Sequence, residues 1–329
     1  MILITNKSKG IDTRIDAIDN LRGIAVLFVF IAHAIEENAF KEYINFGLIG
    51  VFIFFLVSGY CIYQSILKLN KSNYTNFIIF LSKRFSKLYP AYWASILAVL
   101  IFFPGEFSYQ LVLINLSMLQ KIFGYPDLQG VYWTLFVEII YYTIIAIIIL
   151  SNALKLNVLN FFFFFFFVNL GIAFSKIILN FYIPWAYALM IFSFFYGALL
   201  SLFDFNNINY KKLFIFLLLY LLILIINNFV FFDNILGYSL LIAYIVAIIF
   251  FLFFNIFNFK LIPLSLLGKV SYSFYLFHNI VIYVMRDLQI SNSYLNFFLS
   301  FIASFIIAMI SHFIFEKKIY KFLLKIIKS

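Results

Sequence analysis

Residues 131–150, VYWTLFVEIIYYTIIAIIIL, decide the fold of this chain, because they form a long apolar run that carries one charge, Glu138. One crossing of a bilayer by a helix needs about 20 mostly apolar residues, each rising about 1.5 Å. The whole chain of 329 residues shares this character, since 66% are hydrophobic and 11% are charged, whereas soluble domains average about 25% charged residues. The sequence therefore predicts an all-α polytopic membrane protein.

Other apolar stretches of similar length flank this one, and together they predict about ten transmembrane helices. The first is short, and the eighth is separated from the seventh by only a brief polar break. We interpret residues 1–329 as a single transmembrane domain with polar tails at 1–18 and 316–329. The predicted spans are 19–36, 46–67, 86–103, 131–150, 158–175, 184–203, 212–231, 235–257, 266–286 and 294–315.

The distribution of Lys and Arg predicts the orientation of these spans. With ten spans, all but four of the 23 basic residues fall on one side, the exceptions being Lys41, Lys121, Lys176 and Arg286. Because cytoplasmic loops are enriched in Lys and Arg, we expect both termini in the cytoplasm. The net charge of +10 does not point to nucleic acid, because the basic residues are scattered over short polar segments and form no single stripe.

The connection 104–130 falls on the outer side and is the longest between two spans. Glycines and prolines flank an apolar stretch, 111–119. Loops of this length in compact domains are often lids or binding segments. A re-entrant or interfacial helix with a packing role is an equally good interpretation.

Arg22 and His33 lie in the first span, where ionisable side chains are costly and mark candidate functional sites. Eleven residues correspond to three helical turns and about 20°, so the two share one face and lie about 16 Å apart. A neutral imidazole accepts protons at neutral pH, which suits His33 as a general base. The alternative for a membrane histidine is an interhelical hydrogen bond.

Three further spans carry ionisable groups. Glu138 in the fourth span needs a cation or a hydrogen-bond donor, for which Arg22, His33 and Arg84 are the candidates, and a purely structural pairing is also open. His278 lies in the ninth span and His312 closes the tenth.

Basic side chains also precede the third span. Lys83, Arg84 and Lys87 stand just before Pro90, where they can bind phosphates or serve as ordinary cytoplasmic anchors. In the second span, Ser58 is one of several small residues that allow close helix packing, and its hydroxyl is a candidate site group. The single Cys61 excludes a disulfide framework within the chain, and no zinc-ligand spacing or phosphate loop is present, so we predict no metal site.

Three motifs occupy the first hundred residues. The first is IDNLRGIAVLFVFIAH (18–33), in which ten residues separate Arg22 from His33. GVFIFFLVSGY (50–60) contains Ser58, and KRFSKLYPAYW (83–93) contains Arg84 and Lys87.

Three more motifs follow, and all six occur in an order that resembles the acyltransferase 3 family of membrane-bound acyltransferases. YWTLFVEIIYY (132–142) holds Trp133 and Glu138, and LGKVSYSFYLFH (267–278) holds Tyr272 and His278. The last, HFIFEKKIYKF (312–322), has Lys318 where the family usually has Pro, and in the third motif Lys87 replaces the usual second Arg. Lys binds phosphate as a point charge, without the planar fork of Arg.

The resemblance implies an enzyme that transfers an acyl group, most often acetyl from acetyl-CoA, to a hydroxyl of a cell-surface glycan. The acceptor would be an O-antigen of lipopolysaccharide, a capsule or an exopolysaccharide, free or lipid-linked. The lipid bilayer is the other partner, no cofactor would be bound permanently, and the expected location is a bacterial inner membrane. The implied roles are catalysis by His33, Arg22 and Glu138, donor binding by Arg84 and Lys87, and lining of the site by Ser58, Trp133, Tyr272 and His278.

Two other classes of function remain open from the residues themselves. A transporter or flippase for a lipid-linked glycan would use Arg22, Glu138 and the histidines as a polar path, although no inverted repeat is evident. A structural subunit of a polysaccharide-assembly complex would use the same residues for packing. Release of free CoA from acetyl-CoA in the presence of a glycan would distinguish the enzyme from both.

Overall fold

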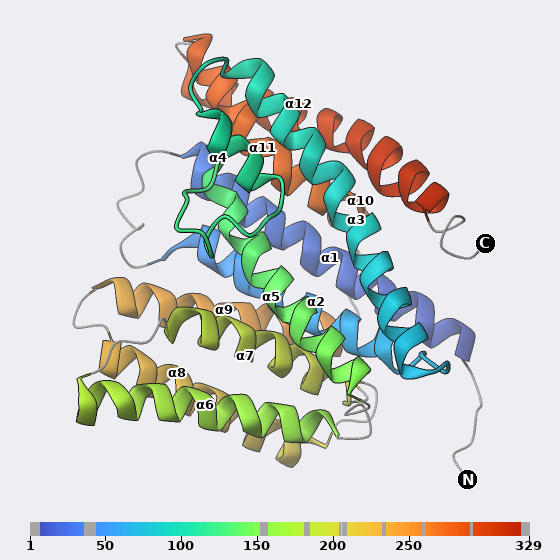
Figure 1. Ribbon diagram of the computed structural model, residues 1–329, viewed down its shortest axis with the longest axis vertical. Coiled ribbons are helices and arrows are strands. Elements are labelled where there is room, and N and C mark those ends of the chain that lie inside the picture. The colour runs from blue at the N-terminus through green and yellow to red at the C-terminus, as the bar shows by residue number, and fades with distance from the viewer. Residues whose placement is uncertain are drawn as a thin grey trace. The chain divides into compact units, whose positions relative to one another are not determined.

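The computed structural model describes residues 7–35, 44–151, 157–180, 185–203, 205, 209–231, 235–257, 261–289 and 292–323. These residues form helices and their connections, and within them no strand occurs (Figure 1). The chain divides into two compact units. Unit one comprises Met1–Ala32, Glu37–Lys68 and Leu156–Lys269, and unit two comprises His33–Glu36, Leu69–Lys155 and Val270–Ser329.

In the part of the chain that is described, eight helices are long and apolar enough to cross a membrane. They confirm the predicted all-α polytopic membrane protein. The sixth and ninth predicted spans correspond to shorter helices, of 16 and 17 residues. The total of ten spans and the orientation stay predictions. The eight are Asp16–Ala34, Phe46–Ile66, Asn73–Phe102, Gly130–Leu150, Val158–Leu179, Tyr210–Phe231, Gly237–Phe257 and Ser293–Leu323.

Unit one is built around α2, which packs against α7 and α9. Any side chain on Gly59 of α2 would collide with the carbonyl oxygen of Phe194, and one on Gly197 of α7 would collide with that of Leu56. This confirms the close packing predicted for the small residues of the second span. The helices of unit one are most of α1 (Lys7–Ala34), α2 (Phe46–Ile66), α6 (Val158–Leu179), α7 (Trp185–Leu200), α8 (Tyr210–Phe231), α9 (Ile235–Phe257) and α10 (Ile262–Lys269).

Unit two contains an antiparallel pair, α3 and α5, which lie side by side (Figure 1). The rings of Tyr92 and Tyr132 are 4.9 Å apart at one end of the pair, and those of Phe80 and Tyr142 are 6.1 Å apart farther along. Unit two contains the end of α1 from His33 onward and seven further elements: α3 (Asn73–Phe102), α4 (Tyr109–Asn115), η1 (Gly130–Tyr132), α5 (Trp133–Leu150), α11 (Ser271–Asp287), α12 (Ser293–Ser311) and η3 (His312–Ile319).

Several helices extend beyond the predicted spans, because a helix does not have to end where its apolar stretch ends. The third helix begins at Asn73, thirteen residues before the predicted 86, and the Ser72 hydroxyl caps it by accepting from the amide of Thr75. The predicted tails are partly helical: α1 begins at Lys7, and the helix of the last span continues through η3, a π-helical segment, to Leu323. Polar residues tolerate helical structure outside the apolar region, so hydropathy located the spans and missed the helix ends.

The predicted ninth span, 266–286, is interrupted. The short helix α10 ends at Lys269, and α11 begins at Ser271 after a break at Val270, which provides no side-chain cap. The amide of Ser273 donates instead to the Glu316 carboxylate at 3.2 Å. The cap of α11 therefore comes from a residue 43 positions later, which no local sequence pattern indicates.

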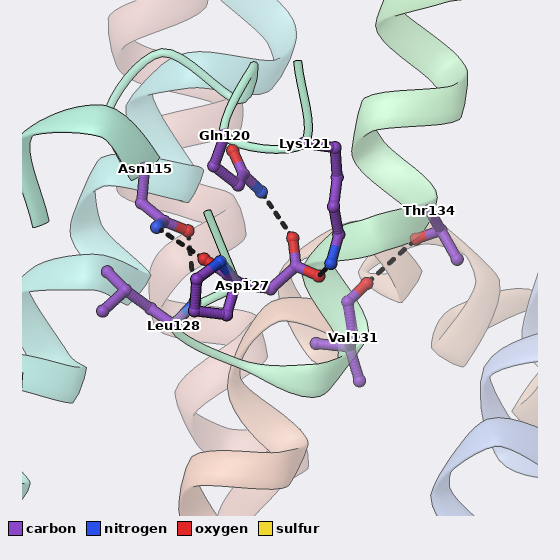
Figure 2. Close-up of polar contacts among 8 residues, drawn as sticks. Asn115, Gln120, Lys121, Asp127, Leu128, Val131 and Thr134 are labelled. Atoms are coloured by element: carbon purple, nitrogen blue, oxygen red, sulfur yellow. Dashed lines mark hydrogen bonds and ion pairs between the residues drawn. The ribbon is translucent and has the colours of Figure 1, made fainter. Parts of the chain in front are cut away.

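The connection 104–130 is a folded segment that contains α4 (Figure 1), and the polar contacts within it are drawn in Figure 2. The buried Asn115 organises it: Oδ1 accepts from the amide of Leu128, and Nδ2 donates to the carbonyl oxygen of Pro126. The Asp127 carboxylate accepts from Gln120 at 2.6 Å and lies 2.7 Å from the ammonium of Lys121. These contacts tie the two halves of the segment together.

The same segment is attached to α3 and α11. The side chains of Tyr89, Tyr92 and Trp93 donate to the carbonyl oxygens of residues 117, 115 and 116, at 2.9, 2.7 and 3.0 Å. Near its end, Gln129 Oε1 accepts from Nδ2 of Asn279 at 2.8 Å. These hydrogen bonds hold the segment 104–130 against α3 and α11, which favours a fixed wall over a mobile lid.

Candidate active site

Unit two gathers most of the predicted site residues. They lie on the end of α1 and on α3, α5 and α11, and they are up to 245 positions apart in the sequence. These residues are His33, Arg84, Lys87, Trp133, Glu138, Tyr272 and His278.

The other two predicted site residues belong to unit one. Arg22 lies on α1, beside a close contact with α10: a side chain on Gly23 or on Gly268 would collide with a backbone carbonyl oxygen of the facing helix. Ser58 lies on α2, next to the glycine that approaches α7. Both side chains are half-buried.

Two histidines meet in unit two. The ring centres of His33 and His278 are 5.4 Å apart, and their planes are inclined by 55°. His278 is fully buried, and its Nδ1 lies 2.8 Å from the carbonyl oxygen of Tyr275 and 3.2 Å from that of Phe274. His33 is half-buried. A polar pair of this kind at the end of α1 is a candidate site for proton transfer.

Arg286 fixes the end of α1 from the neighbouring helix α11. Its Nη2 donates to the backbone carbonyl oxygen of His33 at 2.8 Å, and its guanidinium lies 5.9 Å from the ring centre of Tyr283. The last carbonyl groups of a helix lack partners within the helix and carry partial negative charge, so a cation is favourable there. Arg286 thereby holds the backbone that carries the His33 imidazole.

Arg84 of α3 faces α5 through aromatic rings. Its guanidinium carbon lies 5.3 Å from the ring centre of Phe80 and 5.4 Å from that of Tyr142. The hydroxyl of Tyr142 in turn donates a hydrogen bond to Oε1 of Glu138. Glu138 thus has the hydrogen-bond donor that the sequence predicted it would need, although the donor is a tyrosine on its own helix. Its predicted pairing with Arg22, His33 or Arg84 stays a prediction.

Glu316 is the centre of a second polar cluster. One carboxylate oxygen accepts from both the amide and the hydroxyl of Ser273, at 3.2 and 2.6 Å, and the other lies 3.1 Å from Nδ1 of His312. Lys87 is close enough to interact electrostatically with this carboxylate. A carboxylate at the first turn of α11 is favourable because the helix amides and the helix dipole both attract negative charge there.

The start of α11 is attached to α3 and to the start of α5 by tyrosines. Tyr272 donates to the carbonyl oxygen of Leu88 at 2.7 Å, and Tyr275 donates to that of Val131 at 2.8 Å. The Tyr275 hydroxyl also lies 2.7 Å from that of Thr134, next to Trp133 at the first position of α5. Residues 272 and 275 therefore fix the helix that carries His278.

The sequence did not identify Arg286 and Glu316 as site residues. Arg286 is one of only four basic residues on the predicted outer side, and that isolation was the available signal. Glu316 falls in the predicted polar tail and within the sixth motif, HFIFEKKIYKF, but its contact with Ser273 joins positions far apart in the sequence. Both residues hold elements that carry the histidine pair.

The chain matches the family model described as an acyltransferase domain over residues 15–316. No curated protein and no solved structure matches it significantly. The matched region contains both histidines of the pair, Arg84, Glu138 and Glu316. Since the match covers nearly the whole chain, the protein is an acyltransferase that belongs to the acyltransferase 3 family.

Proposed function

We propose that this acyltransferase moves an acetyl group from acetyl-CoA, supplied from the cytoplasm, to a hydroxyl of a cell-surface glycan in a bacterial inner membrane. The observation that carries the proposal is the combination, within one unit of an acyltransferase-family chain, of a histidine pair on α1 and α11 with cations on α3. O-antigen, capsule and exopolysaccharide are the candidate acceptors, free or lipid-linked. In a multi-pass membrane protein, acetyl-CoA would reach the site from the cytoplasm and the glycan from the opposite side.

His33 is the proposed general base. Its imidazole takes the proton of the glycan hydroxyl, and the oxygen attacks the thioester carbonyl carbon of the donor. The carbon–sulfur bond then breaks, and the CoA thiolate leaves with the proton from His33. A two-step route is equally consistent: the His33 nitrogen attacks the thioester first, CoA leaves, and the acetyl group passes from the histidine to the hydroxyl.

The proposed donor site comprises Arg84 and Lys87, with Arg22 as a further candidate for phosphate binding. The CoA moiety carries phosphates, and guanidinium and ammonium groups are the side chains that bind them. Arg84 is held between the rings of Phe80 and Tyr142, which orders its guanidinium before a ligand arrives. Glu138 is proposed to orient the site or balance its charge, and Ser58, Trp133 and Tyr272 to line it.

Substitution of His33 tests the catalytic assignment. The protein is reconstituted in vesicles with acetyl-CoA labelled in the acetyl group and a surface glycan, and both free CoA and labelled glycan are measured. His33→Ala is expected to lower transfer by about 10²- to 10⁴-fold, the usual contribution of a general base. Ile31→Val, two residues earlier on α1, is the packing control. Retained transfer in His33→Ala would overturn the role of His33, and absence of transfer by the unsubstituted protein would overturn the donor or the acceptor class.

Binding of acetyl-CoA tests the donor site separately. Arg84→Ala is expected to weaken acetyl-CoA binding, measured by calorimetry in detergent. Lys83→Ala is the matched control, because it also removes one positive charge from α3 but from an exposed side chain. Equal affinity of the two variants would remove Arg84 from the donor site.

A further inference from the structure

We infer that the connection 104–130 is embedded in the bilayer. It fills the part of the membrane that α5 does not reach, and the side chain of Leu113 on α4 contacts lipid acyl chains. The ten-span topology alone would leave this connection in water on the predicted outer side. The inference goes beyond the proposed acyl transfer and does not depend on it.

The antiparallel helices α3 and α5 are offset along their common axis. Two ring contacts set their register: Tyr132 lies opposite Tyr92, and Tyr142 lies opposite Phe80. The end of α5 therefore lies beside the start of α3, and the start of α5 lies beside Tyr92. The outer part of α3, 93–102, extends about 15 Å beyond α5.

Both ends of this offset pair expose large apolar side chains. They are Leu97, Ile101 and Phe102 on α3, and Ile147 and Leu150 on α5. Contact with water at either end is unfavourable, so both ends belong in the hydrocarbon core. Because Ile147 lies beside the first turn of α3, it is about 38 Å from Ile101 along the axis, whereas the core is about 30 Å thick. A tilt of roughly 40° brings both ends into the core.

The depth of the connection follows from its hydrogen bonds to α3. The carbonyl oxygens of residues 115–117 accept from the side chains of Tyr89, Tyr92 and Trp93. These donors precede Ile101 by eight to twelve positions, which is about 12 to 18 Å along α3. On a helix tilted by roughly 40° they lie about 9 to 14 Å below the outer boundary of the core. Residues 115–117 therefore approach the middle of the membrane.

The backbone of the connection is satisfied as this depth requires, because non-helical backbone in the hydrocarbon region must find its partners within the protein. The carbonyl groups at the end of α4 lack partners within that helix, and the three α3 side chains supply them. Asn115 bonds the amide of Leu128 and the carbonyl oxygen of Pro126 (Figure 2). The amides of residues 122–125 donate to carbonyl oxygens of residues 119–121. In water, solvent could satisfy all of these groups.

The charged side chains of the connection also fit this placement. Its three charged residues are Glu106, Lys121 and Asp127. The Asp127 carboxylate lies 2.7 Å from the ammonium of Lys121, and paired charges are the form in which ionisable groups are found at membrane depth. Glu106 is exposed and directly follows the end of α3, where the chain leaves the core.

Leu113 provides the contact with lipid. It is 48% exposed on α4, one helical turn before residues 116 and 117. The half-exposed indole of Trp93 lies against the same part of the connection, through its bond to the carbonyl oxygen of Leu116. A side chain exposed at this depth meets acyl chains, and Leu is among the residues most favourable there.

Spin-label accessibility in lipid vesicles tests the placement. Cys61→Ala removes the single cysteine of the chain, and one nitroxide is then attached through Leu113→Cys. Oxygen concentrates in hydrocarbon and a nickel chelate stays in water, so their collision rates with the label report its surroundings. Ile302→Cys, exposed in the middle of α12, is the lipid control, and Glu106→Cys is the water control. We expect the oxygen-to-nickel ratio at Leu113→Cys to match Ile302→Cys and to exceed Glu106→Cys severalfold. A ratio equal to that of Glu106→Cys would overturn the inference.

Two more labels test the tilt on which the depth depends. Ile101→Cys and Ile147→Cys are both expected to give the ratio of the lipid control. A water-like ratio at either position would mean that one end of the pair leaves the bilayer, and the depth of the connection would fall with it.

Chemical modification provides a second readout for the connection itself. A membrane-impermeant maleimide is added to vesicles opened by freezing and thawing, so that both sides are accessible. Because the thiolate is the reactive form and apolar surroundings disfavour it, Leu113→Cys should react on the order of tenfold or more slowly than Glu106→Cys. Equal rates would overturn the inference. Neither measurement involves turnover, so their outcome is independent of whether acyl transfer is found.

Discussion

Replacement of Glu316 by Ala should destabilise unit two through the start of α11. The carboxylate accepts two hydrogen bonds from Ser273 and pairs with His312, and its side chain is only 9% exposed. Loss of a helix cap costs about 0.5–2 kcal/mol, and loss of a hydrogen bond to a charged group costs about 1.5–3 kcal/mol. Because the Ser273 hydroxyl also contacts Ser311 at 2.9 Å, part of its loss is compensated, and we expect a net cost of about 2–4 kcal/mol.

Thermal unfolding of the purified protein in detergent, followed by intrinsic fluorescence, measures this cost. Glu316→Gln keeps a neutral acceptor and should lose about 1 kcal/mol. Lys317→Ala is the control, because an exposed neighbouring side chain should change stability by less than about 0.5 kcal/mol. The expected order of stability is therefore Lys317→Ala, then Glu316→Gln, then Glu316→Ala. If Glu316→Ala unfolded at the same temperature as Lys317→Ala, the capping role of Glu316 would be refuted.

Three further substitutions test other parts of the structure. Gly59→Ala should lower the yield of folded protein sharply, because its methyl group meets a backbone carbonyl of α7. Gly171→Ala, whose methyl group meets no atom within 4 Å, should fold normally and gain up to about 1 kcal/mol of stability. Size-exclusion chromatography in detergent compares the two variants. Tyr142→Leu should weaken acetyl-CoA binding by about two- to thirty-fold through loss of the ring that faces Arg84, while Tyr142→Phe should bind normally in the same calorimetric measurement. Asn115→Leu should expose the segment 104–130 to limited proteolysis by removing its central hydrogen bonds, and unchanged cleavage would mean that the contacts with α3 suffice.

Hydropathy and charge predicted the class of this protein and the places of its spans, because a bilayer imposes both on any chain that crosses it. They did not predict where helices begin. The start of α3 at Asn73 and the extension to Leu323 lie in polar sequence, where no bilayer constraint acts. After the break at Val270, the cap of α11 comes from Glu316, and hydropathy carries no information about such pairing.

The candidate site was partly predictable for a related reason. Ionisable residues inside apolar spans are conspicuous, and His33, Glu138 and His278 were identified in this way. Their partners were not identified: the contact of Arg286 with the His33 backbone depends on which helices pack together, whereas Tyr142 lies one helical turn after Glu138 on the same helix. Tyr142 is an ordinary aromatic residue in a span rich in them, and Arg286 lies at a helix end, where a cation needs no special explanation.

The cap of α11 also has a consequence for how the protein is made. A protein is synthesised in chain order, so Ser273 is made 43 residues before Glu316. Until the last span follows, the first turn of the helix that carries His278 lacks its acceptor, and an unsatisfied amide in apolar surroundings is costly. The histidine pair should therefore become ordered only when insertion is complete. A nascent chain arrested before residue 316 would hold every predicted catalytic residue and still lack the carboxylate that caps this helix.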